Sequence, residues 1–177
     1  THMISLLSLS HHRLISGLVV IVLLFTAPIL WAASELEPTS LELTFMVGDN
    51  INLDEQRRAK PIEICLYELK SSQIFDNSDY FSLQSRDKEV LGADLLKKDC
   101  FILRPGDRRK ISRKSDAETT SIGVLASYRE LENFVWRATY KLPEAPPASW
   151  YRSAMPANKS ALAIQVGGYG LRIKEIN

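Results

Sequence analysis

The chain has 177 residues, with a hydrophobic fraction of 45% and a charged fraction of 24%, which are the values of a folded globular protein. Its net charge is +1, and setting Arg13 aside leaves 21 basic against 21 acidic residues from Glu35 onward. This balance argues against a nucleic-acid partner, which would need a basic excess. The length suits one domain with a sizeable core.

Residues 1–34 read as a short cloning remnant followed by an export segment. From Leu14 to Ser34 the chain carries no charge, and it contains the dense apolar run Leu18–Phe25. A positive residue, Arg13, then a short apolar core and a small-x-small end are typical of a cleaved signal peptide. The alternative is an uncleaved anchor that associates with the membrane through residues 14–33, because about 20 apolar residues can span a bilayer.

Residues 35–177 are therefore expected to form an exported, mainly β domain. Period-2 alternation on both sides of the polar Arg129–Asn133 predicts a hairpin over Ser121–Leu142, with one face in the core and the other in water. Trp136 and Tyr140 are expected to dominate that core. Further strands are expected at residues 39–47, 62–69, 100–103, 108–113, 161–166 and 171–176. About eight strands predict a two-sheet β-sandwich.

Between two of these strands the apolar spacing changes to three or four residues, which predicts a helical insertion at about residues 71–97. Asn77 or Ser78 is expected to cap one short helix, and Asp87 another. After the Arg104–Asp107 turn, the basic cluster Arg108–Lys114 is expected to form a solvated hairpin, with a partner surface as the alternative.

The loop Gly48–Lys60 is long for a strand connection and shows no periodicity, so a functional role is expected for it. The histidines are confined to positions 2, 11 and 12. The exported domain can therefore build neither a histidine-based nucleophile system nor a histidine zinc site. Glu130 and Glu132 are a carboxylate pair, but they lie in a connection where solvated side chains are the default. We expect no enzyme activity, no metal and no cofactor.

Cys65 and Cys100 both lie in expected strands. An oxidising compartment favours a disulfide between them. Buried free thiols are the alternative, because cysteine is common in cores.

Three ordered stretches resemble one family. They are Asn52–Lys70, then Phe75–Leu83 continuing through Leu91–Leu96 to Leu103–Gly106, and finally Ile122–Leu131 followed by Trp136-Arg137. Their order and spacing are similar to TssJ, the small outer-membrane lipoprotein family of the type VI secretion system.

The resemblance implies a transthyretin-like β-sandwich with a non-catalytic role. It implies binding to the periplasmic domain of TssM, with TssL in the same trans-envelope complex, through the loop that corresponds to Gly48–Lys60. Apolar contact is expected from Ile51 and Leu53, and paired charge from other loop residues; alternatively, Asn52 and Asp54 only brace the loop. The expected partner-binding residues are Ile51, Asn52, Leu53, Asp54, Glu55, Gln56, Arg57 and Arg58.

The chain departs from the family pattern at the lipobox, whose cysteine carries the outer-membrane lipid. Here the export segment ends Leu30-Trp-Ala-Ala-Ser34, and the first cysteine is Cys65. A periplasmic, envelope-associated protein without this lipid anchor is therefore expected. The rival interpretation is a generic exported β-sandwich binding module, such as an adhesin or carrier subunit unrelated to secretion.

Overall fold

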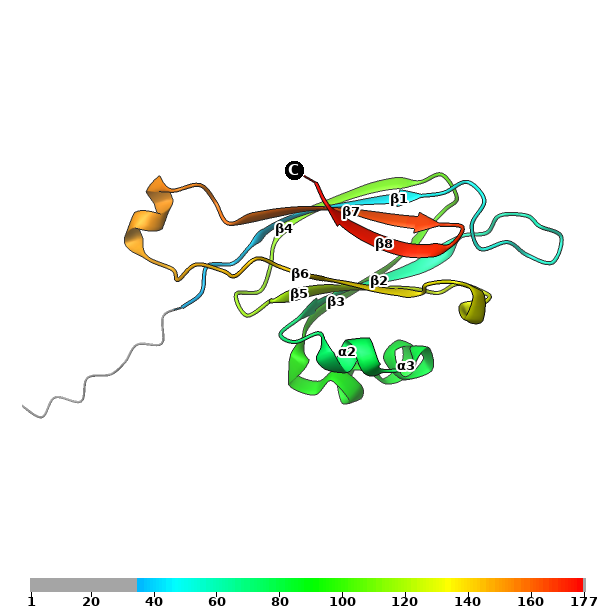
Figure 1. The fold of residues 1–177 in the computed structure, drawn as a ribbon, viewed down its shortest axis with the longest axis horizontal. Coiled ribbons are helices and arrows are strands. Elements are labelled where there is room, and N and C mark those ends of the chain that lie inside the picture. Colours follow the sequence, from blue (N-terminus) through cyan, green and yellow to red (C-terminus); the bar gives the residue numbers. More distant parts are fainter. Residues whose placement is uncertain (1–34, 177) are drawn as a thin grey trace, which may run out of the picture. The chain divides into compact units, whose positions relative to one another are not determined.

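The structure is a computed structural model that describes residues 35–176, so the expectations for residues 1–34 lie outside it. Two four-stranded sheets, ordered β4-β1-β7-β8 and β3-β2-β5-β6, face each other (Figure 1). The mainly β, two-sheet prediction is confirmed. The strands are β1 (Ser40–Val47), β2 (Ile62–Leu69), β3 (Leu95–Leu103), β4 (Arg108–Lys114), β5 (Ser121–Ala126), β6 (Arg137–Lys141), β7 (Lys159–Gly167) and β8 (Gly170–Glu175).

The main core lies between the sheets and follows the alternation of β1. Leu41, Leu43 and Phe45 have no exposed surface, while the residues between them are half-buried. β1 pairs in parallel with β7, which places Leu162 beside Leu43 and Ile164 beside Phe45. This parallel pair holds β1 in the interior of its sheet, with β4 antiparallel on its other side.

The helical insertion covers the outer face of the second sheet. It consists of α2 (Gln73–Asn77), α3 (Tyr80–Leu91) and a 3-10 turn (Gly92–Asp94), and Figure 1 shows it below β2, β3 and β5. Every residue of β5 is consequently buried. The expectation that one face of the central hairpin lies in water is therefore wrong for β5.

Several local expectations for the insertion also need correction. The insertion ends at Asp94 rather than near residue 97, because Leu95 already pairs with Leu69. Asp79, not Asn77 or Ser78, caps α3, accepting a hydrogen bond from the Ser82 amide at 2.9 Å. A kink with non-helical backbone angles at Arg86 divides α3, so a second helical segment does begin near Asp87, whose carboxylate accepts a hydrogen bond from the Lys88 amide at 2.8 Å.

The basic strand β4 forms no hairpin with β3. The Arg104–Asp107 turn carries the chain from one sheet to the other, where β4 pairs with β1. Its charges are mostly solvated, as expected, because Arg108, Arg109, Lys110 and Lys114 are exposed and Arg113 is half-buried. Arg113 forms ion pairs with Glu68 and Asp99 across the sheets, and the Arg109 guanidinium stacks 4.2 Å from the centre of the Phe101 ring.

The central hairpin forms as β5 and β6, but its aromatic residues do not dominate the core. Trp136 and Tyr140 are half-buried, whereas Tyr67, Phe45 and Phe75 are the largest fully buried side chains. A Pro-rich connection then leads from β6 to β7 and carries a 3-10 helix, Trp150–Ala154. Within residues 35–176, no helix is both long and apolar enough for a membrane crossing.

The two cysteines face each other across the β2–β3 ladder. Cys65 and Cys100 occupy the same register position and are joined by a disulfide, which closes a sequence separation of 35 residues. The bond links the strand before the helical insertion to the strand after it.

Candidate functional site

Three connections meet at one end of the sandwich, which we call the loop end. They are the loop Gly48–Lys60, the connection Ser127–Trp136 and the turn Gly167–Gly170, because β1, β5 and β7 all end there. Figure 1 shows the first of these loops projecting beyond the sheets on the right. Backbone hydrogen bonds tie the connections together, including Gly48 N to Val166 O at 2.9 Å and Val135 N to Tyr169 O at 3.3 Å.

Asn52 fixes the base of the long loop. Its side-chain amide donates to the Pro61 carbonyl at 2.8 Å, and its side-chain oxygen accepts from the Arg129 amide at 2.9 Å. Its φ of 49° lies in the left-handed region, which asparagine tolerates better than most residues. Asn52 is 8% exposed, so the structure gives it the bracing role.

Asp54 fixes the tip of the loop. Its carboxylate accepts backbone N–H groups from Arg58 at 2.8 Å and Gln56 at 3.0 Å, and it pairs with the side chains of Arg58 and Lys60. The Arg58 amide is the main cause that lowers the pKa of Asp54 to about 2. The loop is therefore held around an ionised carboxylate.

The remaining expected contact residues divide by exposure. Ile51 is 1% exposed and belongs to the core between the sheets, so the expectation that it supplies partner contact is wrong. Leu53 is half-buried, whereas Glu55, Gln56 and Arg57 are exposed. Arg58 is also exposed, but its side chain pairs with Asp54. Gln56 belongs to the same network, because its side-chain oxygen accepts a hydrogen bond from Arg58 at 3.1 Å.

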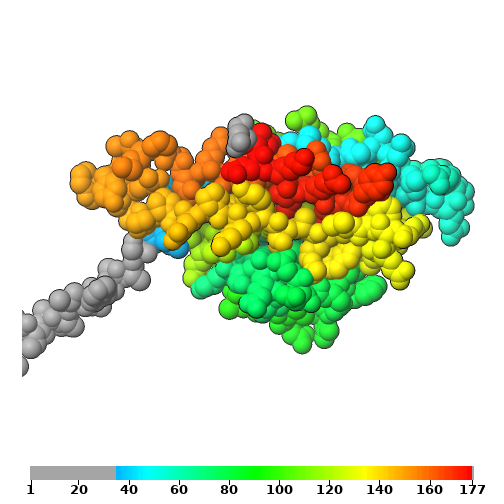
Figure 2. All heavy atoms as spheres, in the orientation of Figure 1, coloured from blue at the N-terminus to red at the C-terminus, as the bar shows by residue number. Residues whose placement is uncertain are grey.

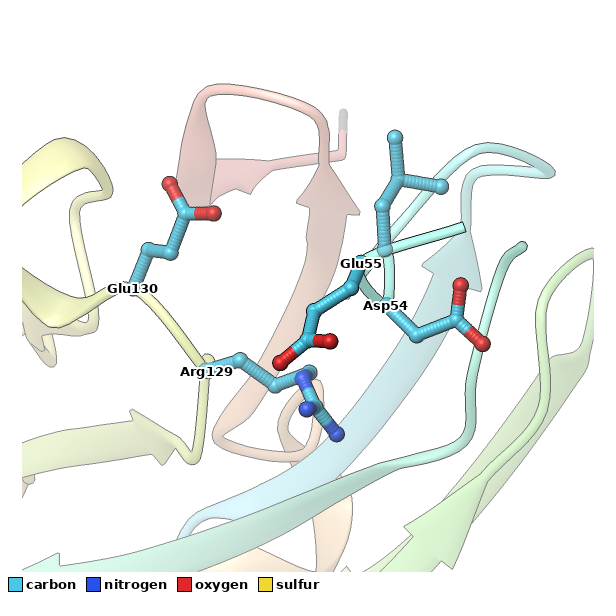
Figure 3. Close-up of a pocket in the computed structure, with 5 residues that line it drawn as sticks. Asp54, Glu55, Arg129 and Glu130 are labelled. Carbon is cyan, nitrogen blue, oxygen red and sulfur yellow. The ribbon is translucent and has the colours of Figure 1, made fainter. Parts of the chain in front are cut away.

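A pocket of about 410 Å³ opens between the long loop and the β5–β6 connection. Figure 3 shows the side chains of Arg129 and Glu55 extending toward each other across it, with Glu130 on the far side. Phe134 lines the pocket and is held in place, because its ring stacks on Tyr128 at 4.9 Å between ring centres. The Tyr128 hydroxyl in turn donates a hydrogen bond to Gly167 O. The lining residues are Asn50, Asn52, Leu53, Asp54, Glu55, Arg57, Arg129, Glu130, Phe134 and Gly168.

Sequence reasoning missed Arg129, Phe134 and Tyr169 as part of this site. Tyr169 is 86% exposed at the tip of the β7–β8 turn. Gly170 beside it has φ of 118°, and a Cβ there would lie 2.4 Å from Val135 N, so only glycine allows the two connections to approach. The signal available in the sequence was Gly167-Gly-Tyr-Gly170, an aromatic residue among turn residues.

A family model described as type VI secretion lipoprotein, VasD, EvfM and TssJ, matches residues 39–169. The chain is 31% identical to a solved structure of the type VI lipoprotein TssJ1 from Pseudomonas aeruginosa. That match covers 79% of this chain and 98% of TssJ1, with a TM-score of 0.68. No curated protein sequence matches the chain.

A second solved structure is Serratia marcescens Lip, described as a membrane-bound component of the type VI secretion system. It is 31% identical, with 79% of this chain and 99% of Lip covered and a TM-score of 0.69. A chain of a type VI membrane complex, at 23% identity and a TM-score of 0.62 over 78% of this chain and 99% of its own, supports the fold alone. The chain described here belongs to the TssJ family of type VI secretion lipoproteins.

Proposed function

We propose that the protein is a non-catalytic structural subunit of the type VI trans-envelope complex, and that its loop end binds the periplasmic domain of TssM. TssL is the further member of the complex. The protein acts in the periplasm, associated with the cell envelope. Family membership supports this function over that of an adhesin or carrier subunit unrelated to secretion.

The observation that carries the proposal is a loop that is braced from within by hydrogen bonds and exposed on its outer side. Asn52 and Asp54 hold its backbone from within, which leaves Leu53, Glu55 and Arg57 facing outward around the pocket. A loop ordered before binding loses less conformational entropy on association. An apolar side chain between opposite charges suits a specific protein interface.

Calorimetric titration with the periplasmic domain of TssM tests the proposal. We expect Leu53→Ala and Arg57→Glu each to weaken binding about tenfold or more, the effect of losing one well-packed or complementary contact. Deleting Asn52–Arg58 should abolish binding, although it also removes both braces.

Lys114→Glu is the matched control, because Lys114 is exposed at the far end of β4. It should bind as the unaltered protein does, and circular dichroism should show all variants folded. Unchanged affinity of the folded deletion variant would place the interface elsewhere, with the basic strand β4 as the next candidate.

A further inference from the structure

The end of the sandwich opposite the loop end carries exposed apolar side chains. Trp150 is 90% exposed, Met155 52%, Tyr151 46% and Leu36 41%. Figure 2 shows the orange segment that contains the first three of them projecting from the body of the domain. We call these four residues the aromatic end patch. Exposed apolar side chains that lie together mark interaction surfaces, whereas singly scattered ones are ordinary.

Hydrogen bonds hold this segment in place at the beginning of the described chain. Glu37 N donates to Pro146 O at 3.0 Å, and Ala148 N donates to Glu35 O at 2.6 Å. The guanidinium of Arg152 donates to a Glu37 carboxylate oxygen at 2.7 Å. The exposed rings are therefore presented by a fixed scaffold that includes residues 35–37.

The segment Pro143–Asn158 carries few charged side chains that would lose their hydration if its surface were buried. Between Pro143 and Asn158 the charged residues are Glu144 and Arg152, and Arg152 is paired with Glu37. The rings of Trp150 and Tyr151 contact each other edge-to-face at 5.8 Å. Each ring combines an apolar body with one polar group, a combination that favours the boundary between lipid headgroups and acyl chains.

The position in the chain indicates which partner the patch meets. The uncharged sequence from Leu14 to Ala33 ends three residues before Leu36. Three residues span at most about 10 Å of extended chain. Leu36 forms a bridge with Pro147, so the segment that carries the patch pairs with the part of the chain that directly follows this apolar sequence.

We propose that the aromatic end patch inserts into the interfacial region of a lipid bilayer and so anchors this end of the domain to the membrane. The contact adds to any attachment through residues 14–33 and does not depend on TssM. It needs no basic excess, because apolar burial rather than attraction to anionic lipid provides the binding.

Tryptophan fluorescence of the full chain in vesicles tests the proposal. All variants carry Trp31→Phe, so that Trp150 and the half-buried Trp136 are the remaining indoles. The vesicles contain phosphatidylethanolamine and phosphatidylglycerol, with or without bromine on the acyl chains near the headgroup. We expect brominated lipid to quench Trp150 and the bilayer to remove most of its quenching by aqueous iodide. Trp150→Phe should lose the bromine-quenched emission.

Trp150→Phe combined with Tyr169→Trp is the matched control. It moves an exposed indole to the loop end, where the side chain is 86% exposed, and this indole should stay open to iodide and unquenched by bromine. Equal iodide access at positions 150 and 169 in vesicles would overturn the proposal. Protection of Trp150 without bromine quenching would overturn it as well, and would show that a second copy or another protein surface covers the patch.

Discussion

At the scale of single residues, Arg113 and Glu68 form the most deeply placed ion pair described here. The Glu68 side chain is fully buried, and its Oε1 lies 2.8 Å from Arg113 Nη2. Its other oxygen accepts from the Asp116 amide at 2.8 Å and the Thr119 hydroxyl at 3.2 Å. The pair thus links β2 of one sheet to β4 of the other.

Arg113→Met should lower the free energy of unfolding by about 3–5 kcal/mol, because it leaves the Glu68 carboxylate buried and unpaired. Denaturant titration measures this loss. The control is Lys110→Met on the same strand, which breaks an exposed pair with Glu42 and should cost about 1 kcal/mol or less. Equal losses in the two variants would show that Glu68 does not need its partner.

Asp54 predicts how the loop responds to acid. Its folded-state pKa of about 2 lies below the ordinary value of 3.8, so its contribution to loop order is fully present above pH 4. It is lost as the pH falls toward 2, when the carboxylate is protonated. Amide chemical shifts of Gln56 and Arg58 should stay constant from pH 7 to about 4 and change below. A transition near pH 4 or above would contradict this arrangement.

At the scale of elements, the helical insertion can pack on β5 because Gly123 has no side chain. A Cβ on Gly123 would lie 2.9 Å from the Phe75 ring and 3.1 Å from a Leu69 methyl group. Phe75 has no exposed surface and packs at 5.0 Å from the Tyr67 ring centre. The insertion therefore rests directly on the β5 backbone.

Gly123→Ala should cost about 1–3 kcal/mol of stability through overpacking, and Phe75→Ala about 3–5 kcal/mol through a cavity. Because the two positions are in contact, the double variant should cost less than the added single losses, by about 0.5 kcal/mol or more. Thermal unfolding of all three variants measures this coupling. Strict additivity would mean that the two residues do not meet.

The disulfide belongs to the β2–β3 ladder, and its removal should mainly affect the unfolded chain. Replacing both Cys65 and Cys100 by Ala should lower stability by about 3–4 kcal/mol, the entropic estimate for closing a 35-residue separation. The measurement is chemical unfolding of the double variant beside the oxidised protein. Two reactive thiols in the denatured, unreduced protein would rule the bond out.

Helices and strands could be predicted from the sequence where a single local pattern, such as alternation or a turn motif, determines the structure. The alternation of Leu41, Leu43 and Phe45 identifies β1, and the glycine-rich turn identifies β7 and β8. Leu95 was misassigned because its spacing fits a helix, while the ladder with β2 decides its state. The burial of both faces of β5 could not be read from alternation, since it comes from the helices packed outside.

At the scale of the whole molecule, the candidate site could be predicted only in part. The long loop was recognisable from its length, but Arg129 and Phe134 join it through topology, which brings the ends of β1, β5 and β7 together. The sequence also could not distinguish residues that would contact a partner from residues that support the loop. Ile51 and Asn52 look like their neighbours in the chain, yet they are buried and hold the loop from beneath.

The two ends should behave as independent sites. Arg57→Glu at the loop end and Trp150→Ser in the aromatic end patch lie at opposite ends of the sheets and share no contact, so any effects on unfolding should add within about 0.5 kcal/mol. Each should also leave the other site's binding unchanged. Chemical unfolding of the single and double variants, with TssM titration of Trp150→Ser, checks both statements. Coupling between them would point to a change transmitted through the core.

β1 joins those two ends directly. Its eight residues span about 26 Å and are hydrogen-bonded to β4 on one side and β7 on the other. A pull applied between Ser40 at the start of β1 and the loop that follows Val47 would run along this strand. The ladder bonds on both sides lie across that direction, so they would have to shear together instead of opening one after another. The domain should thus resist stretching between its two ends, with little extension under load.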